Sequence, residues 1–142
     1  MKKIIIFLAV ITIVIIILFL WQNKPQQISS PAPTPLQETP QLISTKPDPL
    51  DETIVSSTEV IELTFSRPLE NVPEFKIKIE PKPDYRVELS GDKKTAKIIP
   101  VAPFELGTTY TLFVTQDSKF EGGGKLEKEL NFHFRTIKYR GF

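Results

Sequence analysis

Hydrophobic and polar positions divide the chain into one unbroken apolar run, a proline-rich stretch and a series of short alternating runs. Residues 4–21 read IIIFLAVITIVIIILFLW, and Thr12 is the only polar side chain before Trp21. A helix over these positions is about 27 Å long, close to the bilayer's apolar thickness of about 30 Å. We therefore expect residues 1–24 to form a transmembrane α-helical signal anchor that contacts the lipid bilayer through residues 4–21.

The flanks of the apolar run predict its orientation. Lys2 and Lys3 precede the run and only Lys24 follows it closely, so the positive-inside rule places the N-terminus in the cytoplasm and the rest of the chain outside. A cleaved signal peptide is the alternative, although such peptides have an apolar core of about 7 to 15 residues followed by small residues. The sequence favours an uncleaved, single-pass anchor in the cell membrane. Because the chain has no cysteine, it has no lipoprotein anchor and no disulfide.

Residues 25–50 predict an extended linker. Each proline fixes its own φ and biases the preceding residue toward extended geometry, which makes the segment a stiff spacer. A ligand for a proline-recognising groove is the alternative interpretation of the PAPTP motif, but the position between anchor and domain favours a spacer. The prolines of this segment are Pro25, Pro31, Pro33, Pro35, Pro40, Pro47 and Pro49.

Residues 51–138 alternate apolar and polar side chains with a period of two, which is typical of strands with one buried face. Ile61, Leu63 and Phe65 alternate with polar neighbours, and no helical pattern follows Trp21. The pattern predicts an all-β fold, an antiparallel sandwich of about seven strands, with Phe65, Phe132 and Phe134 in its core and residues 139–142 as a C-terminal tail. The runs lie at 59–66, 75–80, 85–89, 95–99, 109–115 and 126–136, with a weak one at 53–56.

Charge and side-chain chemistry argue against several functions. The chain has 18 Lys and Arg against 17 Asp and Glu, so it lacks the positive excess of a nucleic-acid-binding protein. The basic cluster Lys93, Lys94 and Lys97 is interpreted as protection of strand edges against pairing. His133 is the single histidine and lies in the outward set of the last strand, so no histidine pair exists for a metal or for nucleophile activation.

Acidic side chains supply the remaining candidates for chemistry. Glu127 and Glu129 are a conceivable acid and base pair, but their spacing favours a solvated face of one strand. Asp48, Asp51 and Glu52 are candidate calcium ligands at the start of the domain, although no glycine-punctuated loop spaces them. We therefore predict no catalytic residue, no metal, no cofactor and no small-molecule substrate, with a weak calcium site as the alternative.

The stretch FELGTTYTLFV, residues 104–114, resembles the corner that precedes the penultimate strand of many Ig-like and fibronectin type III domains. Leu106, Gly107 and Tyr110 match that corner, in which the tyrosine ring packs in the core and its hydroxyl bonds to the backbone upstream. With LTFSRPL (63–69), IIP (98–100) and FHFRT (132–136), the order is similar to bacterial Ig-like domains of surface-layer and other cell-envelope proteins. The resemblance covers about residues 49–137. Three consecutive glycines, 122–124, depart from the loop pattern of such domains and predict a flexible loop tip.

The resemblance implies a domain that binds rather than catalyses. We expect a membrane-anchored, extracytoplasmic Ig-like domain that acts as a binding, adhesion or spacer module for an unknown protein or glycan. The loop tips at Gly91 and at Gly122 to Gly124 are the expected contact surfaces. An accessory subunit of a membrane-embedded secretion or wall-synthesis complex is the alternative. A wall hydrolase is a third reading, and it requires catalytic residues from a partner.

Overall fold

The computed structural model describes residues 15–17 and 38–138. Most of the predicted anchor, the first half of the predicted linker and the predicted tail at 139–142 lie outside these residues. Within the described part of the chain, no helix is long and apolar enough to cross a membrane.

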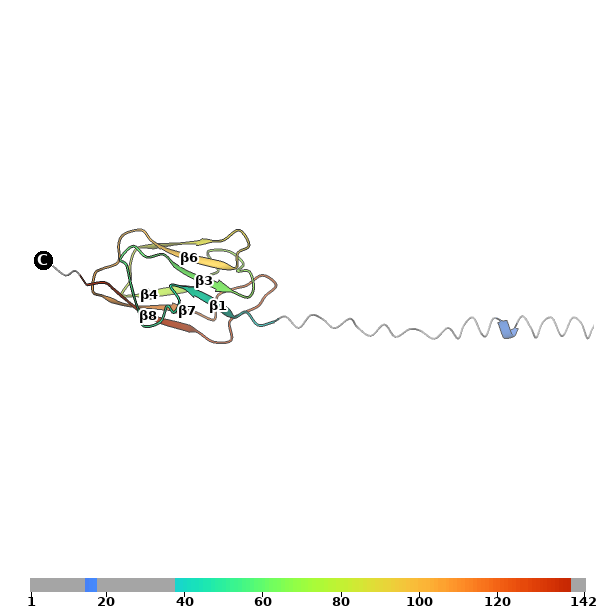
Figure 1. Cartoon of the computed structure of the whole chain (residues 1–142). Coiled ribbons are helices and arrows are strands. Elements are labelled where there is room, and N and C mark those ends of the chain that lie inside the picture. Colours follow the sequence, from blue (N-terminus) through green and yellow to red (C-terminus); the bar gives the residue numbers. More distant parts are fainter. Residues whose placement is uncertain (1–14, 18–37, 139–142) are drawn as a thin grey trace, which may run out of the picture. The chain divides into compact units, whose positions relative to one another are not determined.

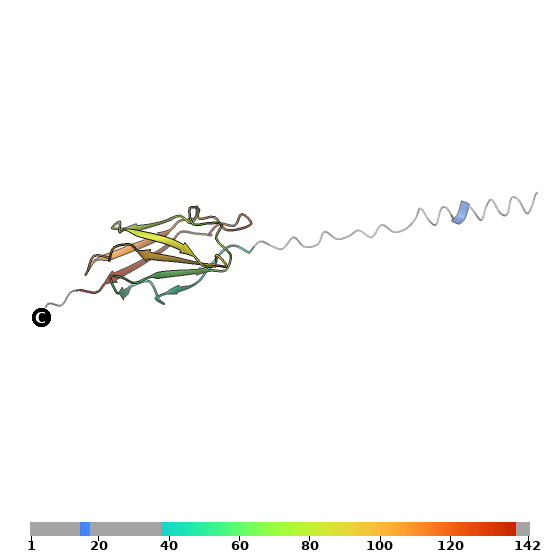
Figure 2. The ribbon, with the colours of Figure 1, turned by 90° about the horizontal axis from the view of Figure 1, so that it is seen from above.

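Residues 38–138 form a sandwich of two four-stranded sheets (Figures 1 and 2). One sheet has the strand order β1-β3-β6-β5 and the other has the order β2-β8-β7-β4. The strands are β1 (Leu42–Lys46), β2 (Thr53–Val55), β3 (Ile61–Phe65), β4 (Ile77–Glu80), β5 (Tyr85–Leu89), β6 (Thr95–Pro100), β7 (Thr109–Val114) and β8 (Leu130–Thr136). The prediction of an all-β sandwich is thus confirmed.

The structure corrects the predicted strand count and the predicted pairing. It has eight strands in the described residues instead of about seven, and β2 pairs with β8 in parallel rather than antiparallel. Every other pair of neighbouring strands in the two sheets is antiparallel. Alternation shows which side chains face the core but carries no information on strand direction, so the parallel pair was not predictable from it.

The additional strand, β1, lies in the segment predicted to be linker. It pairs with β3, with Leu42 opposite Phe65 and Lys46 opposite Glu62. Pro40 before β1 and Leu50 after it are both buried. The assignment of residues 25–50 to an extended linker is therefore wrong for the half that includes β1, because the prolines flank this strand without interrupting it.

The core lies between the two sheets and is built from the inward positions of the alternating runs. Ile61 and Leu63 are fully buried, and Phe65 is 1% exposed. The ring of Phe65 packs edge-on against Phe75 and Phe120, with centroids 5.9 and 5.3 Å away. Phe134 is also buried at the predicted position, whereas Phe132 is only partly buried against the core.

The two chain ends of the domain lie at opposite ends of the sandwich. The segment before β1 enters at one end, and the chain leaves after β8 at the other (Figure 1). The strands run along the axis between these ends (Figures 1 and 2). Each group of connecting loops therefore belongs to either the N-terminal or the C-terminal end of the domain.

Candidate functional site

Tyr110, at the start of β7, anchors the C-terminal end of the sandwich. Its ring is 4% exposed and stacks on Phe134 with a centroid distance of 5.6 Å. Its hydroxyl oxygen accepts a hydrogen bond of 2.9 Å from the backbone N–H of Glu105. This geometry is that of a tyrosine corner, and it fixes the segment before β7 to the core.

Gly107 and Thr136 complete this corner. Gly107 has a φ of 69°, in the left-handed region that favours glycine, and its N–H donates to the carbonyl of Ile137 at 2.9 Å. The buried Thr136 hydroxyl donates to the carbonyl of Glu105 at 2.5 Å and accepts from the N–H of Thr108 at 3.1 Å. Thr136 was not singled out from the sequence, since a threonine at a strand end has no distinctive spacing.

Leu106, which matches the corner in sequence, does not belong to the core. Its side chain is 45% exposed, whereas Phe104 is 2% exposed with its ring centroid 5.1 Å from that of Tyr110. The aromatic side chain two positions earlier therefore provides the core contact.

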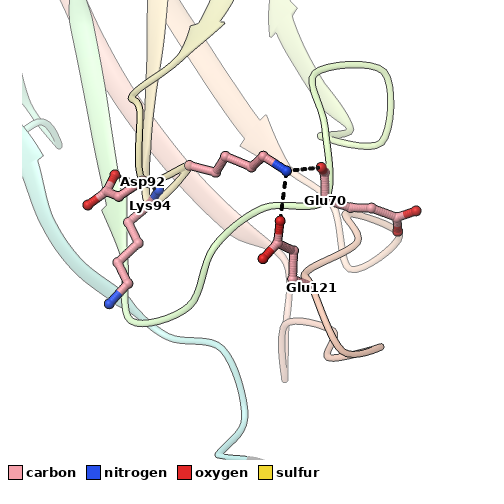
Figure 3. A network of polar contacts seen from close by, with 5 residues as sticks. Glu70, Asp92, Lys94 and Glu121 are labelled. Carbon is pink, nitrogen blue, oxygen red and sulfur yellow. Dashed lines mark hydrogen bonds and ion pairs between the residues drawn. The ribbon is translucent and has the colours of Figure 1, made fainter.

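The two nominated loop tips lie together at the N-terminal end of the sandwich. Lys93, next to Gly91 in the β5–β6 turn, places its amine 2.7 Å from the Glu121 carboxylate and 3.4 Å from the Glu70 carbonyl (Figure 3). In the same turn, hydrogen bonds from the Ser90 hydroxyl and the Lys94 amide hold the pKa of Asp92 below its ordinary value of 3.8. Three loops distant in sequence are thus connected at this end.

The glycine-rich loop is packed against the domain on both sides of its tip, while Gly122 and Gly123 at the tip are exposed. Phe120, within the loop, is fully buried and pairs with Leu69 in an isolated β-bridge. The Arg67 guanidinium donates to the carbonyls of Glu121 at 2.5 Å and Glu38 at 3.3 Å. A Cβ added to Gly124 would lie 2.7 Å from this guanidinium. The loop therefore rests on the segment that leads into β1.

Two lysines of the predicted basic cluster, Lys93 and Lys97, form ion pairs with different glutamates. Lys97 lies 3.6 Å from the Glu62 carboxylate across the β3–β6 pair, while Lys93 pairs with Glu121. Both ion pairs are largely exposed to solvent, where such pairs contribute little stability. Each pair neutralises its lysine locally, so these two residues do not form a common cationic patch.

His133 and Asp51 meet at the surface of β8. The His133 amide donates to Asp51 Oδ1 at 2.7 Å, and the ring Nδ1 lies 3.3 Å from the same oxygen. The hydrogen bond from the amide lowers the pKa of Asp51. Asp51 therefore positions the segment before β2 against β8. This structural role accounts for the Asp51–His133 contact without a ligand.

The other candidate acidic residues are Asp48, Glu52, Glu127 and Glu129. Across residues 15–17 and 38–138, no three His, Cys, Asp or Glu side chains gather to hold a metal ion. Asp48 and Glu52 are exposed, as are Glu127 and Glu129. The Glu127 contact in the structure comes from its backbone carbonyl, which accepts from the Gln116 amide at 2.6 Å.

An exposed apolar surface lies at the C-terminal end, where none was predicted. Ile54 is 67% exposed and Ile137 is 49% exposed. These two isoleucines, with Arg135, Thr136 and Lys138, line a surface pocket of about 320 Å³, here called the C-terminal patch. No local pattern marks this patch, because Ile54 and Ile137 come from β2 and from the segment after β8, which the parallel pairing brings together.

Residues 37–136 match the family model of the bacterial Ig-like domain. The chain belongs to this family. The resemblance drawn from residues 104–114 and the flanking motifs is thereby confirmed for the domain. No curated protein matches the chain as a relative.

Solved structures share the Ig-like fold. Domains 1–6 of the surface layer protein SbsC are 21% identical, with a TM-score of 0.50 and coverage of 72% of this chain and 14% of that one. PcoC, a methionine-rich copper resistance protein from Escherichia coli, is 22% identical, with a TM-score of 0.53 and coverage of 69% and 98%. The chain thus matches a small part of the surface-layer protein and nearly all of PcoC. At these identities the likeness shows the fold alone.

Proposed function

We propose that the chain is a single-pass envelope protein whose Ig-like domain makes non-catalytic contacts with a protein or glycan outside the cytoplasmic membrane. The observation that carries the proposal is the order of segments in the sequence. An apolar run at residues 4–21, preceded by Lys2 and Lys3, comes before a proline-rich segment and then the Ig-like domain. Such an order positions a rigid binding surface at a distance from the bilayer.

The C-terminal patch is the proposed contact surface. Exposed apolar side chains that cluster beside a pocket mark interaction sites more often than isolated ones do. Ile54 and Ile137 supply the apolar area, and Arg135 and Lys138 line the same pocket. The N-terminal end of the domain carries the segment that leads toward the anchor, whereas this end is opposite to it (Figure 1).

The family of the domain and the name of one structural neighbour support the proposed envelope role. One neighbour is a surface layer protein, and the family is that of bacterial Ig-like domains. The ring of the single histidine, His133, is exposed and lies beside the Asp51 carboxylate. The domain is therefore proposed to recognise a partner rather than to transform a substrate.

The test uses the absence of cysteine from the chain. A full-length Ile137→Cys variant is expressed in cells, and its thiol is labelled with a maleimide that does not cross membranes. We expect labelling of intact spheroplasts, and retention of the protein in membranes after an alkaline wash. A cysteine inserted between Met1 and Lys2 is the matched control, because it keeps both lysines, and it should be labelled only after the membrane is permeabilised. Labelling of this control alone, or release of the protein by the wash, would contradict the proposal.

A further inference from the structure

Four strands form the edges of the two sheets, namely β1 and β5 in one and β2 and β4 in the other. Edge strands expose unpaired backbone groups unless a bulge, a proline or shortness prevents pairing. The register of β1 is irregular between Leu42 and Ser44, β2 has three residues, and β4 has four residues and ends at Pro81. β5 has five residues in regular register with β6, so it is the edge least protected against another strand.

The free backbone groups of β5 belong to its odd-numbered residues. The carbonyl of Asp84 accepts from the N–H of Val101 at 2.9 Å, and the N–H of Ser90 donates to the carbonyl of Thr95 at 2.9 Å. In an antiparallel pair, successive residues direct their N–H and C=O groups alternately toward and away from the neighbour. The even positions therefore face β6, and Tyr85, Val87 and Leu89 direct theirs to the open edge.

The side chains of β5 are complementary to those of a second β5. The strand reads Tyr-Arg-Val-Glu-Leu, with Arg86 and Glu88 exposed and the three odd residues half-buried on the inner face. When two copies run antiparallel about an axis through Val87, Arg86 of each lies opposite Glu88 of the other. Tyr85 likewise lies opposite Leu89, which pairs an aromatic with an aliphatic side chain.

We propose that two copies of this chain associate through β5, paired antiparallel about a two-fold axis at Val87. The β1-β3-β6-β5 sheets of the two copies then form one continuous sheet. Tyr85, Val87 and Leu89 exchange backbone hydrogen bonds with the second copy through the groups that now face the open edge. This self-association goes beyond the proposed envelope function and does not depend on membrane anchoring.

The register places the charged side chains where they interact best. In this arrangement Arg86 and Glu88 occupy non-hydrogen-bonded pairs, in which facing Cα atoms are about 4.5 Å apart and side chains are closest. Within one copy, Arg86 Nε lies 3.0 Å from Glu88 Oε1, in an ion pair whose side chains are 59% and 53% exposed. A register shifted by one residue would bring each charge opposite a residue of the inner set and lose this match.

A groove with a partly apolar lining includes residues of β5. Val72 and Val101 are 39% and 64% exposed and line a pocket of about 530 Å³ together with Tyr85, Val87, Pro83 and the charged residues Lys82 and Asp84. A second copy at β5 covers part of this apolar surface. The groove thus adds buried area to the hydrogen bonds and charge pairs.

The first test is a single cysteine placed on the proposed axis. Val87→Cys in the purified full-length chain, held in detergent micelles, brings two thiols together only when two copies meet at β5. Facing Cα atoms of a hydrogen-bonded pair are about 5.5 Å apart, within the range that a disulfide spans. We expect a disulfide-linked dimer under a mild oxidant. Ser44→Cys on β1 is the control edge, and equal crosslinking there, or none at Val87→Cys, would overturn the proposal.

Charge exchange is the second test, carried out in the Val87→Cys background. Glu88→Arg places like charges opposite each other and should reduce the crosslinking rate at least tenfold, whereas the double variant Arg86→Glu, Glu88→Arg should restore it. Glu80→Lys on β4 is the matched control, because Lys78 and Glu80 form an ion pair with the same spacing on an edge strand of the other sheet. Pairing at β5 would be refuted if the double variant did not restore crosslinking. It would also be refuted if Glu80→Lys abolished crosslinking. Restoration by the double variant also excludes misfolding as the cause.

Discussion

Tyr110 combines a buried ring with one hydrogen bond through its hydroxyl, so substitution separates the two contributions. Tyr110→Phe leaves the Glu105 N–H without its acceptor and should lower the free energy of unfolding by about 1 kcal/mol. Tyr110→Ala also removes a ring in contact with Phe104 and Phe134, and it should cost about 3 to 5 kcal/mol. Denaturant unfolding of the native protein and the two variants measures both losses in the free energy of unfolding. Equal stabilities would mean that Tyr110 does not anchor the corner.

Gly107 is required by its backbone conformation. A φ of 69° is unfavourable for a residue with a Cβ, so Gly107→Ala should destabilise the domain by about 1 to 2 kcal/mol. The added Cβ would also lie 3.2 Å from Lys138 Cγ, which belongs to a flexible side chain and can move. Gly91→Ala is the control, since nothing lies within 4 Å of a Cβ there, and its effect should stay within about 0.5 kcal/mol. Equal losses in thermal unfolding would contradict the role given to the φ angle.

Asp92 makes stability depend on pH. Its pKa is lowered in the folded state by the hydrogen bonds from the Ser90 hydroxyl and the Lys94 amide. A lowered folded pKa gives stability that is present above the ordinary value of 3.8 and is lost as the pH falls through the folded pKa. Asp92→Asn should therefore melt below the native protein at pH 6, and the difference should shrink toward pH 2. A difference in melting temperature that is constant with pH would contradict this account.

At the scale of the strands, most of the fold was predictable because one face of each sheet is buried. β3 and β7 show strict alternation, and the buried positions Leu63 and Leu112 are the ones that the pattern predicts. β1 was missed because the sequence Leu-Ile-Ser-Thr-Lys does not alternate and lies between prolines. Its exposed Ile43 and half-buried Leu42 show that β1 is held by pairing with β3 more than by burial.

The candidate site was less predictable than the fold. The tyrosine corner lies within one short stretch, residues 104–114, whose resemblance to Ig-like domains identified Gly107 and Tyr110. The C-terminal patch depends on the parallel pairing of β2 with β8, and the packed loop depends on Arg67 reaching Glu121 from another loop. Such long-range contacts leave no periodic signal in a single sequence.

The location of β1 predicts where the folded domain begins. A fragment that starts at residue 38 should unfold cooperatively, since it contains β1 and the buried Leu50. A fragment that starts at residue 51, the boundary predicted from the sequence, lacks both and leaves the edge of β3 and part of the core exposed. We expect a lower melting temperature or no cooperative transition for the shorter fragment, as measured by circular dichroism. Identical melting curves would show that β1 is dispensable.

For the whole molecule, the two chain ends of the domain bear on the proposed function. The segment before β1 enters at one end, and the C-terminal patch lies at the other (Figure 1). A partner at the patch and an anchor before β1 would therefore apply force along the strands. β5 lies at a lateral edge of its sheet, so pairing between copies leaves both ends free.

The parallel pair of β2 and β8 has a mechanical consequence. Since the two strands run in the same direction, tension on the N-terminal side of β2 and the C-terminal side of β8 slides one strand past the other. Their shared hydrogen bonds, including the one from Ile137 N–H to the Val55 carbonyl at 3.0 Å, are then strained together rather than peeled apart one by one. Shear of this kind resists rupture more than peeling does, so the β2–β8 pair opposes separation of its own two strands under such tension.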